Sequence, residues 1–468
     1  MDDFLREIQT SLFREWINNQ KRDYYHLHQS ETDPDAIIIE NEYCYSYVTF
    51  NPQCIIELCV MNKRTDEMAF YLHFQFKTLK HAISLFEEMD QCIKKMIDQP
   101  ICRLLLCCSG GMTTAFFADK IKNGIKVLNL NMEVAATSYQ KIYNVAQNYD
   151  VILLAPQVSY VKLQVEKVFK NKLVLKIPTQ IFASYNVGAL ITFIEESLKH
   201  KENKYNGYVE PLASTMEIKT NKNVLAVSIN ANGENSHISY RLYNSHQDIV
   251  LDSNIIKSNI KLQDVLDALD TVVLQNEMID VISIALPGVM VEGNVYSGII
   301  EGGNHQLKER LEKRYEKEIY LINDVNAAVV GYYASQNEYK SLAFLFQPIG
   351  RMAGSGIVVN GQLVRGMDHL AGEVALLPLN LSDAYLTLAN TPEGTLELVT
   401  KNIMSIIAIV APEAIVVYSD LILDSQDVSD EIKKALSQYP LKVYPQIIKV
   451  ENILEYILLG AMILSAKE

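Results

Sequence analysis

The sequence predicts an α/β protein built from more than one structural unit. A chain of 468 residues is too long for one ordinary hydrophobic core. Short apolar runs alternate with helical segments after residue 100, and a β-meander followed by an α/β unit occurs twice after residue 223. We therefore predict an α+β domain at residues 1–100 and a small parallel-sheet domain at residues 101–200. A polar linker at residues 201–222 and a two-lobed domain at residues 223–468, divided near residue 335, follow.

The composition is that of a soluble globular protein, with 49% hydrophobic and 21% charged residues. A formal net charge of −14 argues against nonspecific nucleic-acid binding, which requires clustered Lys and Arg. No segment has the eighteen or so uncharged apolar residues of a membrane span, and the acidic start MDDFLREIQ is unlike a signal peptide. We expect a cytoplasmic protein that does not insert into a membrane, with reduced thiols.

The first hundred residues carry no chemical motif. Their pattern predicts two helices and three β-rich segments: residues 4–19 and 79–97, and residues 36–50, 54–61 and 68–76. No helix-turn-helix pattern is present, which argues against direct DNA binding. A ligand-binding module and an oligomerisation module both fit this region.

Residues 101–198 alternate between predicted strands and helices, which predicts a small parallel sheet with helices on both faces. The strands are predicted at Cys102–Cys107, Val127–Asn131, Val151–Leu154 and Leu173–Lys176. Ligands of such folds bind at the carboxyl ends of the strands, and Cys108 follows the first of them.

Cys108 is the strongest candidate for a reactive group. It precedes a turn of Ser109, Gly110 and Gly111, and Thr113 and Thr114 are suitable caps for a helix from about Ala115. Backbone N–H groups in such a turn, together with the positive end of a helix dipole, favour a thiolate and can hold a phosphate attached to it.

A purely structural role is the alternative for any cysteine at the end of a strand, because cysteine is among the most buried residue types. Cys107 points to the opposite face of the predicted strand, so we assign that role to it.

Two motifs in this region resemble the EIIB domain of the lactose/cellobiose class of the bacterial phosphotransferase system. Its phosphoryl-accepting C-S-A-G-M-S-T turn resembles the segment from Cys108 to Thr114, and its G-P-Q-V-x-Y motif resembles residues 155–160. Tyr185 and Gly188 are similar to a later Tyr-x-x-Gly. The resemblance implies that Cys108 accepts a phosphoryl group from an EIIA phosphocarrier, in a phosphate-binding turn of Ser109, Gly110, Gly111, Met112, Thr113 and Thr114.

Residues 224–468 resemble the ROK family of sugar kinases and sugar-responsive regulators. The similar segments are VISIALPG, YLINDVNAA, GSGIVVNG and AGE, which begin at residues 281, 320, 354 and 371. The resemblance implies an actin-like, ribonuclease-H-like duplicated fold, and also a homodimer. It further implies a sugar site of Asn323, Asp324 and Glu373, in which Asp324 occupies the position of the general base. Asn323 and Asp324 also suit the start of a helix, so a capping role is the alternative.

The chain departs from the ROK kinases at three places. The phosphate-loop motif D-I-G-G-T-K corresponds to the six residues from Ser228 to Gly233, so the Asp and both glycines are lost. A glycine of the second loop is Met352, preceded by Arg351. The zinc-site His is Leu376, and no cysteine follows Cys108. The sequence therefore predicts no metal and no cofactor, with the zinc site absent, and argues against ATP/Mg-dependent sugar phosphorylation.

We accordingly expect a phosphotransferase-system protein in which Cys108 carries phosphate, coupled to a kinase-dead sugar-binding module whose Asp324 is a vestigial base. The expected partners are an EIIA phosphocarrier, an EIIC permease and a small sugar or glycoside. One alternative is a sugar-responsive regulator or sensor that passes no phosphate to sugar, and another is an active sugar kinase. The sequence leaves open whether the protein is an enzyme.

Overall fold

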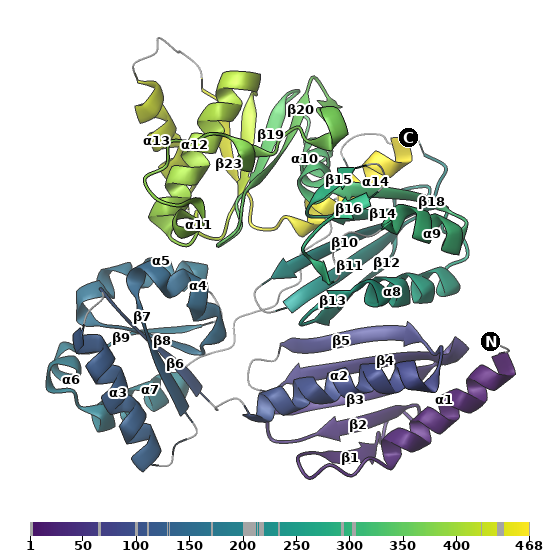
Figure 1. Ribbon diagram of the computed structural model, residues 1–468, viewed down its shortest axis with the longest axis horizontal. Helices are drawn as coiled ribbons and strands as arrows, with labels where there is room; N and C mark the ends of the chain where they lie inside the picture. Colours follow the sequence, from purple (N-terminus) through teal and green to yellow (C-terminus); the bar gives the residue numbers. More distant parts are fainter. Residues whose placement is uncertain are drawn as a thin grey trace.

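The structure is a computed structural model of a mixed α/β chain (Figure 1). It describes residues 3–63, 67–98, 102–109, 112–128, 130, 132–169, 172–199, 212, 214, 220–232, 235–291, 294–301, 306–422, 424–437 and 444–467. Most of the predicted linker at 201–222 lies outside these residues. No helix in the described part of the chain is long and apolar enough to cross a membrane.

The N-terminal region and the following lobe share one ten-stranded sheet, in the order β1-β2-β3-β4-β5-β12-β11-β10-β14-β18. Its N-terminal strands form an antiparallel meander: β1 (His26–Gln29), β2 (Ala36–Glu40), β3 (Cys44–Asn51), β4 (Ile55–Asn62) and β5 (Met68–Gln75). Its other strands are β10 (Val224–Asn232), β11 (Asn235–Tyr243), β12 (Ile249–Lys257), β14 (Val281–Leu286) and β18 (Glu318–Asn323). The β5–β12 junction pairs Tyr71 with Ile256. Residues 1–100 thus extend the sheet of the lobe beyond residue 223.

Four helices pack near this sheet: α1 (Asp3–Asn18), α2 (Leu79–Asp98), α8 (Leu262–Gln275) and α9 (Leu307–Tyr315). One continuous hydrophobic core runs from Phe13 of α1 to Ile319 of β18. The N-terminal region and the first lobe therefore share one hydrophobic core, although a long segment of the chain separates them in sequence.

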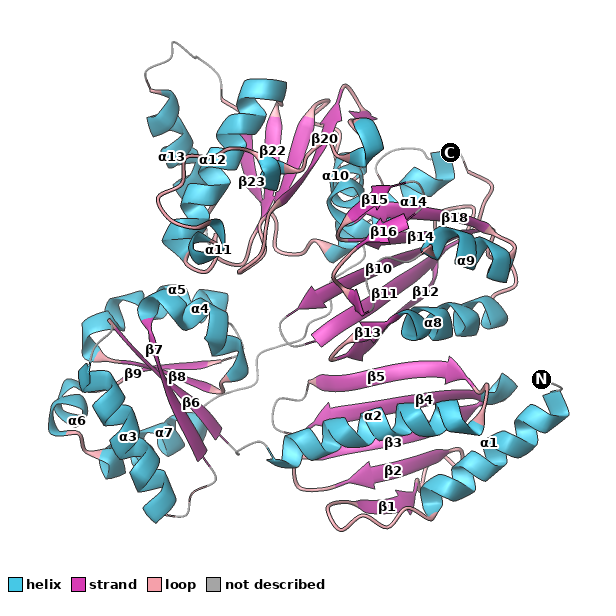
Figure 2. Ribbon diagram, viewed as in Figure 1, coloured by secondary structure: helices cyan, strands magenta, loops and turns pink. Residues whose placement is uncertain are grey.

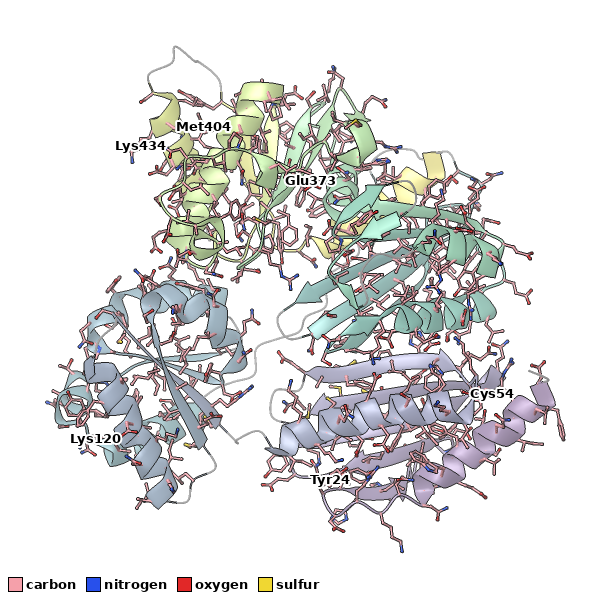
Figure 3. All side chains as sticks on the ribbon, viewed as in Figure 1. Tyr24, Cys54, Lys120, Glu373, Met404 and Lys434 are labelled. Atoms are coloured by element: carbon pink, nitrogen blue, oxygen red, sulfur yellow. The ribbon has the colours of Figure 1, made fainter. Side chains whose placement is uncertain are left out.

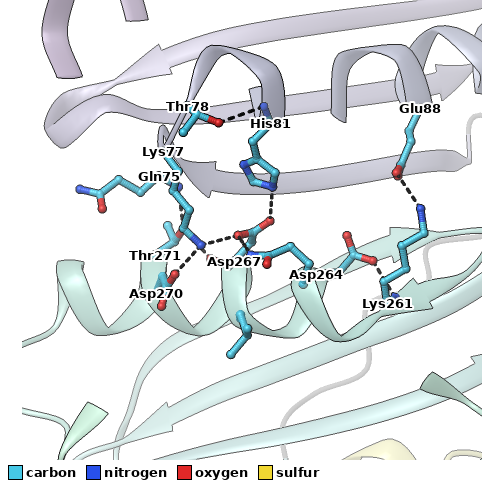
Figure 4. Close-up of polar contacts among 12 residues, drawn as sticks. Gln75, Lys77, Thr78, His81, Glu88, Lys261, Asp264, Asp267, Asp270 and Thr271 are labelled. Carbon is cyan, nitrogen blue, oxygen red and sulfur yellow. Dashed lines mark hydrogen bonds and ion pairs between the residues drawn. The ribbon is translucent and has the colours of Figure 1, made fainter. Parts of the chain in front are cut away.

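A buried ionic network fastens α2 and the end of β5 to α8 (Figure 4). Lys77 Nζ lies 2.5 Å from Asp267 Oδ1 and 2.5 Å from Asp270 Oδ2, and His81 Nε2 lies 2.9 Å from Asp267 Oδ2. The buried Lys257 pairs with Glu88 of α2 and with Asp264 of α8, each at 2.5 Å. Because buried charges are costly unless they are paired, this network fixes how the two regions join.

Residues 102–199 form the predicted parallel sheet, in the order β7-β6-β8-β9 (Figure 2). Its strands are β6 (Cys102–Cys108), β7 (Met132–Ser138), β8 (Val151–Leu154) and β9 (Leu173–Lys176). Its helices are α3 (Met112–Val127), α4 (Ile142–Val145), α5 (Lys162–Val168), α6 (Thr179–Ser184) and α7 (Val187–Lys199). Three short 3₁₀ segments follow β7, α4 and β8: η2 (Tyr139–Lys141), η3 (Ala146–Asn148) and η4 (Pro156–Val161).

The strand predicted at Val127–Asn131 is wrong. Val127 ends α3 with its side chain 83% exposed, and the strand next to β6 begins only at Met132. A short apolar run does not distinguish the end of a helix from a strand. The helix also starts earlier than predicted, at Met112, so Thr113 and Thr114 lie within its first turn and do not cap it.

The region after residue 223 repeats one arrangement twice. In each half an antiparallel meander is followed by two parallel strands, giving the matching orders β12-β11-β10-β14-β18 and β21-β20-β19-β22-β23. The second half contains β19 (Leu342–Phe346), β20 (Gly354–Val359), β21 (Gln362–Leu363), β22 (Ala414–Tyr418), β23 (Gln446–Lys449), α11 (Tyr385–Leu388), α12 (Pro392–Val410) and α13 (Ser425–Leu436). Short elements in and between the halves are β13 (Ile260–Lys261), β15 (Val289–Val291), β16 (Asn294–Tyr296), β17 (Ile300–Glu301), η5 (Met367–His369) and η6 (Val374–Leu376). The sequence prediction of a repeated meander and α/β unit is confirmed.

Two helices cross between the halves: α10 (Asp324–Ala334) and the C-terminal α14 (Leu454–Lys467) (Figure 1). They cross at two glycines. A Cβ on Gly331 would lie 2.0 Å from Tyr456 O, and one on Gly460 would lie 1.8 Å from Ala327 O. Their shared core includes Val224 and Ala285 of the first sheet, so the chain beyond residue 454 packs against the first half as well as the second.

A buried ion pair attaches α14 to the first sheet. Arg241 of β11 makes a two-pronged contact with Glu455, at 2.8 Å and 3.0 Å, and both side chains are buried. Bidentate geometry of this kind is the form in which a buried pair best offsets its desolvation cost.

We predict that Gly460→Ala destabilises the protein by about 2 kcal/mol, because the clash with the backbone of α10 exceeds the roughly 1 kcal/mol gain in helix propensity. Gly188→Ala in α7 is the matched control. Its Cβ would meet only Asn186 Oδ1 at 3.7 Å, so its stability should stay level or rise. Chemical denaturation measures both, and equal stability of the two variants would contradict the tight crossing.

Candidate functional site

Cys108 is the last residue of β6, one of the two central strands of the small sheet. Its side chain is 5% exposed, and its Sγ lies 3.9 Å from the carbonyl oxygen of Thr137 on β7. The predicted position of this thiol at a strand end, before a helix, is confirmed. Cys107 is completely buried, and burial raises the pKa of its thiol to about 12, as expected for a structural cysteine.

The turn after Cys108 is described only in part. Ser109 is exposed at a bend, whereas Gly110 and Gly111 lie outside the described residues. Met112, Thr113 and Thr114 form the first turn of α3, with no description of their side chains. The phosphate-binding role of these six residues stays a prediction.

The second motif of the small domain lies at the same sheet edge as Cys108. The residues from Pro156 to Val161 form η4 directly after β8, the strand beside β6, and Ala155 N donates to Cys107 O at 2.9 Å. Tyr160 and Leu163 project from this edge with 75% and 72% of their surface exposed.

The same edge of the small sheet contacts the second half of the duplicated region. Tyr139, which follows the β7 residue paired with Cys108, donates its hydroxyl proton to Glu393 Oε1 at 2.9 Å. Leu421 is buried in the core of the small domain, and Ile349 packs against that core. Figure 1 shows α4 and α5 facing α11. No local sequence pattern predicts this contact, because the bonded residues are 254 positions apart.

Asn323 and Asp324 lie at the junction of β18 and α10, as predicted. Asn323 caps the helix by accepting from Val325 N and Asn326 N, and its Nδ2 donates to Gly288 O at 3.2 Å. Asp324 is 7% exposed, and its Oδ1 accepts from Val325 N at 2.9 Å. Asn323 therefore has the alternative role of a helix cap. In Asp324, Oδ1 accepts this backbone hydrogen bond, and Oδ2 is the second oxygen of the carboxyl group.

Glu373 approaches Asp324 from the second half. A hydrogen bond from Ser355 N to Gly372 O, at 3.0 Å, pins the turn that carries Glu373 against β20. Gly372 has φ +93° and approaches Ser355 O so closely that a Cβ would lie 1.9 Å away. Figure 3 places Glu373 where the two halves face each other. The charge of Glu373 acts on the pKa of Asp324, so the two carboxyl groups lie within electrostatic range of each other.

Burial and the nearby Glu373 determine how Asp324 titrates. The pKa of Asp324 is raised from 3.8 to about 6, chiefly by burial and to a smaller extent by the negative charge of Glu373, against the lowering effect of hydrogen bonds from backbone N–H groups. Burial also raises the pKa of Glu373. A carboxyl group with a pKa near neutrality can exchange a proton with a bound hydroxyl.

The residues at the three departures from the kinase motifs differ in burial. Ser228, at the position of the kinase Asp, is completely buried in β10, and the strand continues to Asn232 before it pairs back with Asn235. Gly233 lies outside the described residues. Met352 and Leu376 are exposed by 52% and 77%. Within the described ranges, no three His, Cys, Asp or Glu side chains are grouped so that they could hold a metal ion.

Two family models match the chain. Residues 103–191 match the lactose/cellobiose-specific IIB subunit of the phosphotransferase system, and residues 232–394 match the ROK family. One chain thus combines a IIB region and a ROK region, which links the protein to the phosphotransferase system and to sugars. No curated protein matches the sequence.

Solved structures of ROK proteins are similar to about half of the chain. A ROK family protein from Streptococcus pneumoniae in complex with sucrose is 19% identical, with a TM-score of 0.41, over 52% of this chain and 97% of that one. The ROK hexokinase from Thermus thermophilus is 17% identical, with a TM-score of 0.43, over 52% and 99%. A ROK family transcriptional regulator, a homolog of the E. coli MLC protein, is 15% identical, with a TM-score of 0.41, over 53% and 78%.

We predict that Asp324→Asn changes the pH dependence of stability. Because the folded-state pKa lies above the unfolded value, the stability contributed by Asp324 is present below about pH 4 and is lost as pH rises through 6. Relative to the wild type, Asp324→Asn should therefore gain about 2 kcal/mol between pH 4.5 and 7.5. Denaturation at both pH values measures this gain. Asp430→Asn, on the exposed face of α13, is the control, and profiles of the two variants that coincide would contradict the buried, raised pKa.

Proposed function

We propose that this is a phosphotransferase-system protein in which Cys108 accepts a phosphoryl group from a phosphohistidine EIIA partner. In this step the Cys108 sulfur attacks phosphorus, a P–S bond forms and the P–N bond breaks, and the thiol proton passes to the departing ring nitrogen so that neutral imidazole leaves. The observation that carries the proposal is the position of Cys108 at the carboxyl edge of the IIB-type sheet, beside the η4 motif. The exposed Tyr160 and Leu163 would contact the EIIA partner.

The second part of the proposal is that residues 223–467 form an actin-like ROK module that binds a sugar without phosphorylating it from ATP. Its support is the repeated strand order and the meeting of Asp324 with Glu373. Catalysis of phosphoryl transfer depends on preorganised groups around the phosphates and the metal. Here the buried Ser228, in the middle of β10, stands where the kinase motif has its carboxylate. In this proposal Asp324 contacts the bound sugar, and its former role as the general base of a kinase is vestigial.

The contact between the regions supports coupling of phosphate and sugar states. Tyr139 directly follows Ser138, the β7 residue that pairs with Cys108. Its hydroxyl group donates a hydrogen bond to Glu393 at the start of α12. The loop that holds Ile349 continues into Gly350, where a Cβ would lie 3.9 Å from Asn144 Oδ1 of α4. A structural change at the sheet edge that carries Cys108 would therefore act directly on residues of the second half of the ROK region that contact this edge. The same contact also fits the alternative function, a sugar-responsive regulator or sensor that passes no phosphate to sugar and in which the phosphoryl group acts only as a signal.

Phosphorylation of Cys108 is directly testable. Incubation with phosphoenolpyruvate, enzyme I, HPr and a panel of EIIA proteins should label the wild type and the Cys107→Ser control but leave Cys108→Ser unlabelled. Autoradiography and peptide mass spectrometry measure the label. Equal labelling of Cys108→Ser, or no label from any EIIA protein of the panel, would refute the phosphotransfer step.

The kinase-dead assignment predicts no sugar-dependent ATP consumption with hexoses or β-disaccharides, because the carboxylate and glycines of the first phosphate loop are replaced. A coupled assay of ADP release measures this. Turnover by the wild type that is abolished in Asp324→Asn would show an active kinase instead.

A further inference from the structure

An exposed apolar stripe runs along α1. Four large apolar side chains of this helix have between 42% and 67% of their surface exposed: Phe4, Leu5, Ile8 and Leu12. Phe13 and Ile17, on the other side of the helix, are buried in the core of the ten-stranded sheet, so the stripe faces outward from a fixed helix. The exposed Glu7 and Glu15 follow Phe4 and Leu12 by three residues and therefore flank the stripe. The helix thus presents apolar side chains beside negative charge.

An open groove of about 600 Å³ lies between α8 and α9. Its lining consists of Leu262, Gln263 and Leu266 of α8 and of Arg310, Lys313 and Arg314 of α9. The three cations share one side of α9, because they are spaced by three and four residues. Asp270 accepts two hydrogen bonds from Arg314, at 2.7 Å and 2.6 Å, whereas Arg310 and Lys313 are exposed. The groove presents half-buried leucines beside positive charge, which complements the stripe on α1.

The stripe and the groove cannot meet within one chain. All four helices α1, α2, α8 and α9 pack into one core on the same face of the ten-stranded sheet. Arg14 ties α1 to Gln29 of β1 at one end of this sheet, and α9 packs beside β18 at the other end (Figure 1). A two-fold axis through the middle of this row of helices reverses its order, and so it places α1 of each copy over α8 and α9 of the other.

We propose that the protein forms a two-fold dimer in which the α1 stripe of each copy occupies the α8–α9 groove of the other. The apolar stripe then lies against the two leucines of the groove, and the two carboxylates that flank it face Arg310 and Lys313. A second copy is the occupant because the chain itself carries the matching surface. In a chain of net charge −14, these opposite charges orient two copies that otherwise repel each other.

This dimer goes beyond the proposed phosphotransfer and sugar binding. The helix α1 lies outside residues 103–191 and 232–394, which match the IIB and ROK family models. The inference therefore assigns a role to the N-terminal region, for which the sequence left a ligand-binding module and an oligomerisation module open. Because the contact is made twice, its buried area and its affinity depend on both copies.

Charge reversal tests the contact in the full chain. Sedimentation velocity from about 1 to 100 μM should show a wild-type dimer that weakens as salt rises. Glu7→Lys/Glu15→Lys in α1 and Arg310→Glu/Lys313→Glu in the groove should each raise the dimer dissociation constant about 10- to 100-fold, because like charges then meet at both contacts. An equimolar mixture of the two variants should recover the dimer. In the mixed dimer the original charges meet at one contact and the exchanged charges meet at the other.

Two matched controls reverse charges on α13: Asp430→Lys/Glu431→Lys and Lys433→Glu/Lys434→Glu. Both should dimerise as the wild type does. Circular dichroism should show the α1 and groove variants folded, because the substituted side chains are exposed. A wild type that stays monomeric, or an α1 variant that dimerises like the wild type, would overturn the proposal. So would a groove variant of wild-type affinity, the result expected if α1 pairs with α1, or a mixture that dimerises no better than its components.

Discussion

The crossing of α10 and α14 is the contact on which the rest of the duplicated region depends. Gly331 and Gly460 let the two backbones approach to a distance that no side chain would permit. The shared core of these helices reaches both sheets, so the crossing sets how the halves face each other. Asp324 begins α10, and β20 packs against its first turn through Gly356, whose Cβ would lie 2.5 Å from Val325 O. The meeting of Asp324 and Glu373 follows from this close packing.

The small domain is an insertion within a larger body. The chain leaves the ten-stranded sheet after β5 and α2, forms the four-stranded sheet, and returns to the first sheet at β10. Tyr139 and Leu421 join its carboxyl edge to the second half of the duplicated region. The carboxyl edge of the small sheet, where Cys108 ends β6, is thus in contact with the second half of the duplicated region.

The sequence predicted those parts of the fold that are encoded locally. The strand before Cys108, the helix cap at Asn323 and the repeated meander rest on apolar periodicity and short motifs, and the structure confirms them. The joining of residues 1–100 to the first lobe was not predicted, because the β5–β12 pairing and the Lys257 network depend on residues far apart in sequence. The strand predicted at Val127 failed because a brief apolar run carries no period.

The central claim is that phosphate on Cys108 and ligand in the ROK region influence each other through the Tyr139–Glu393 contact. The most direct measurement is the initial rate of Cys108 phosphorylation by phospho-EIIA, with and without a saturating sugar, in the wild type and in Glu393→Gln. The account predicts a ligand-dependent rate in the wild type and a smaller dependence in the variant, because the variant loses a charged acceptor at the contact. Identical rates with and without ligand in the wild type would contradict it.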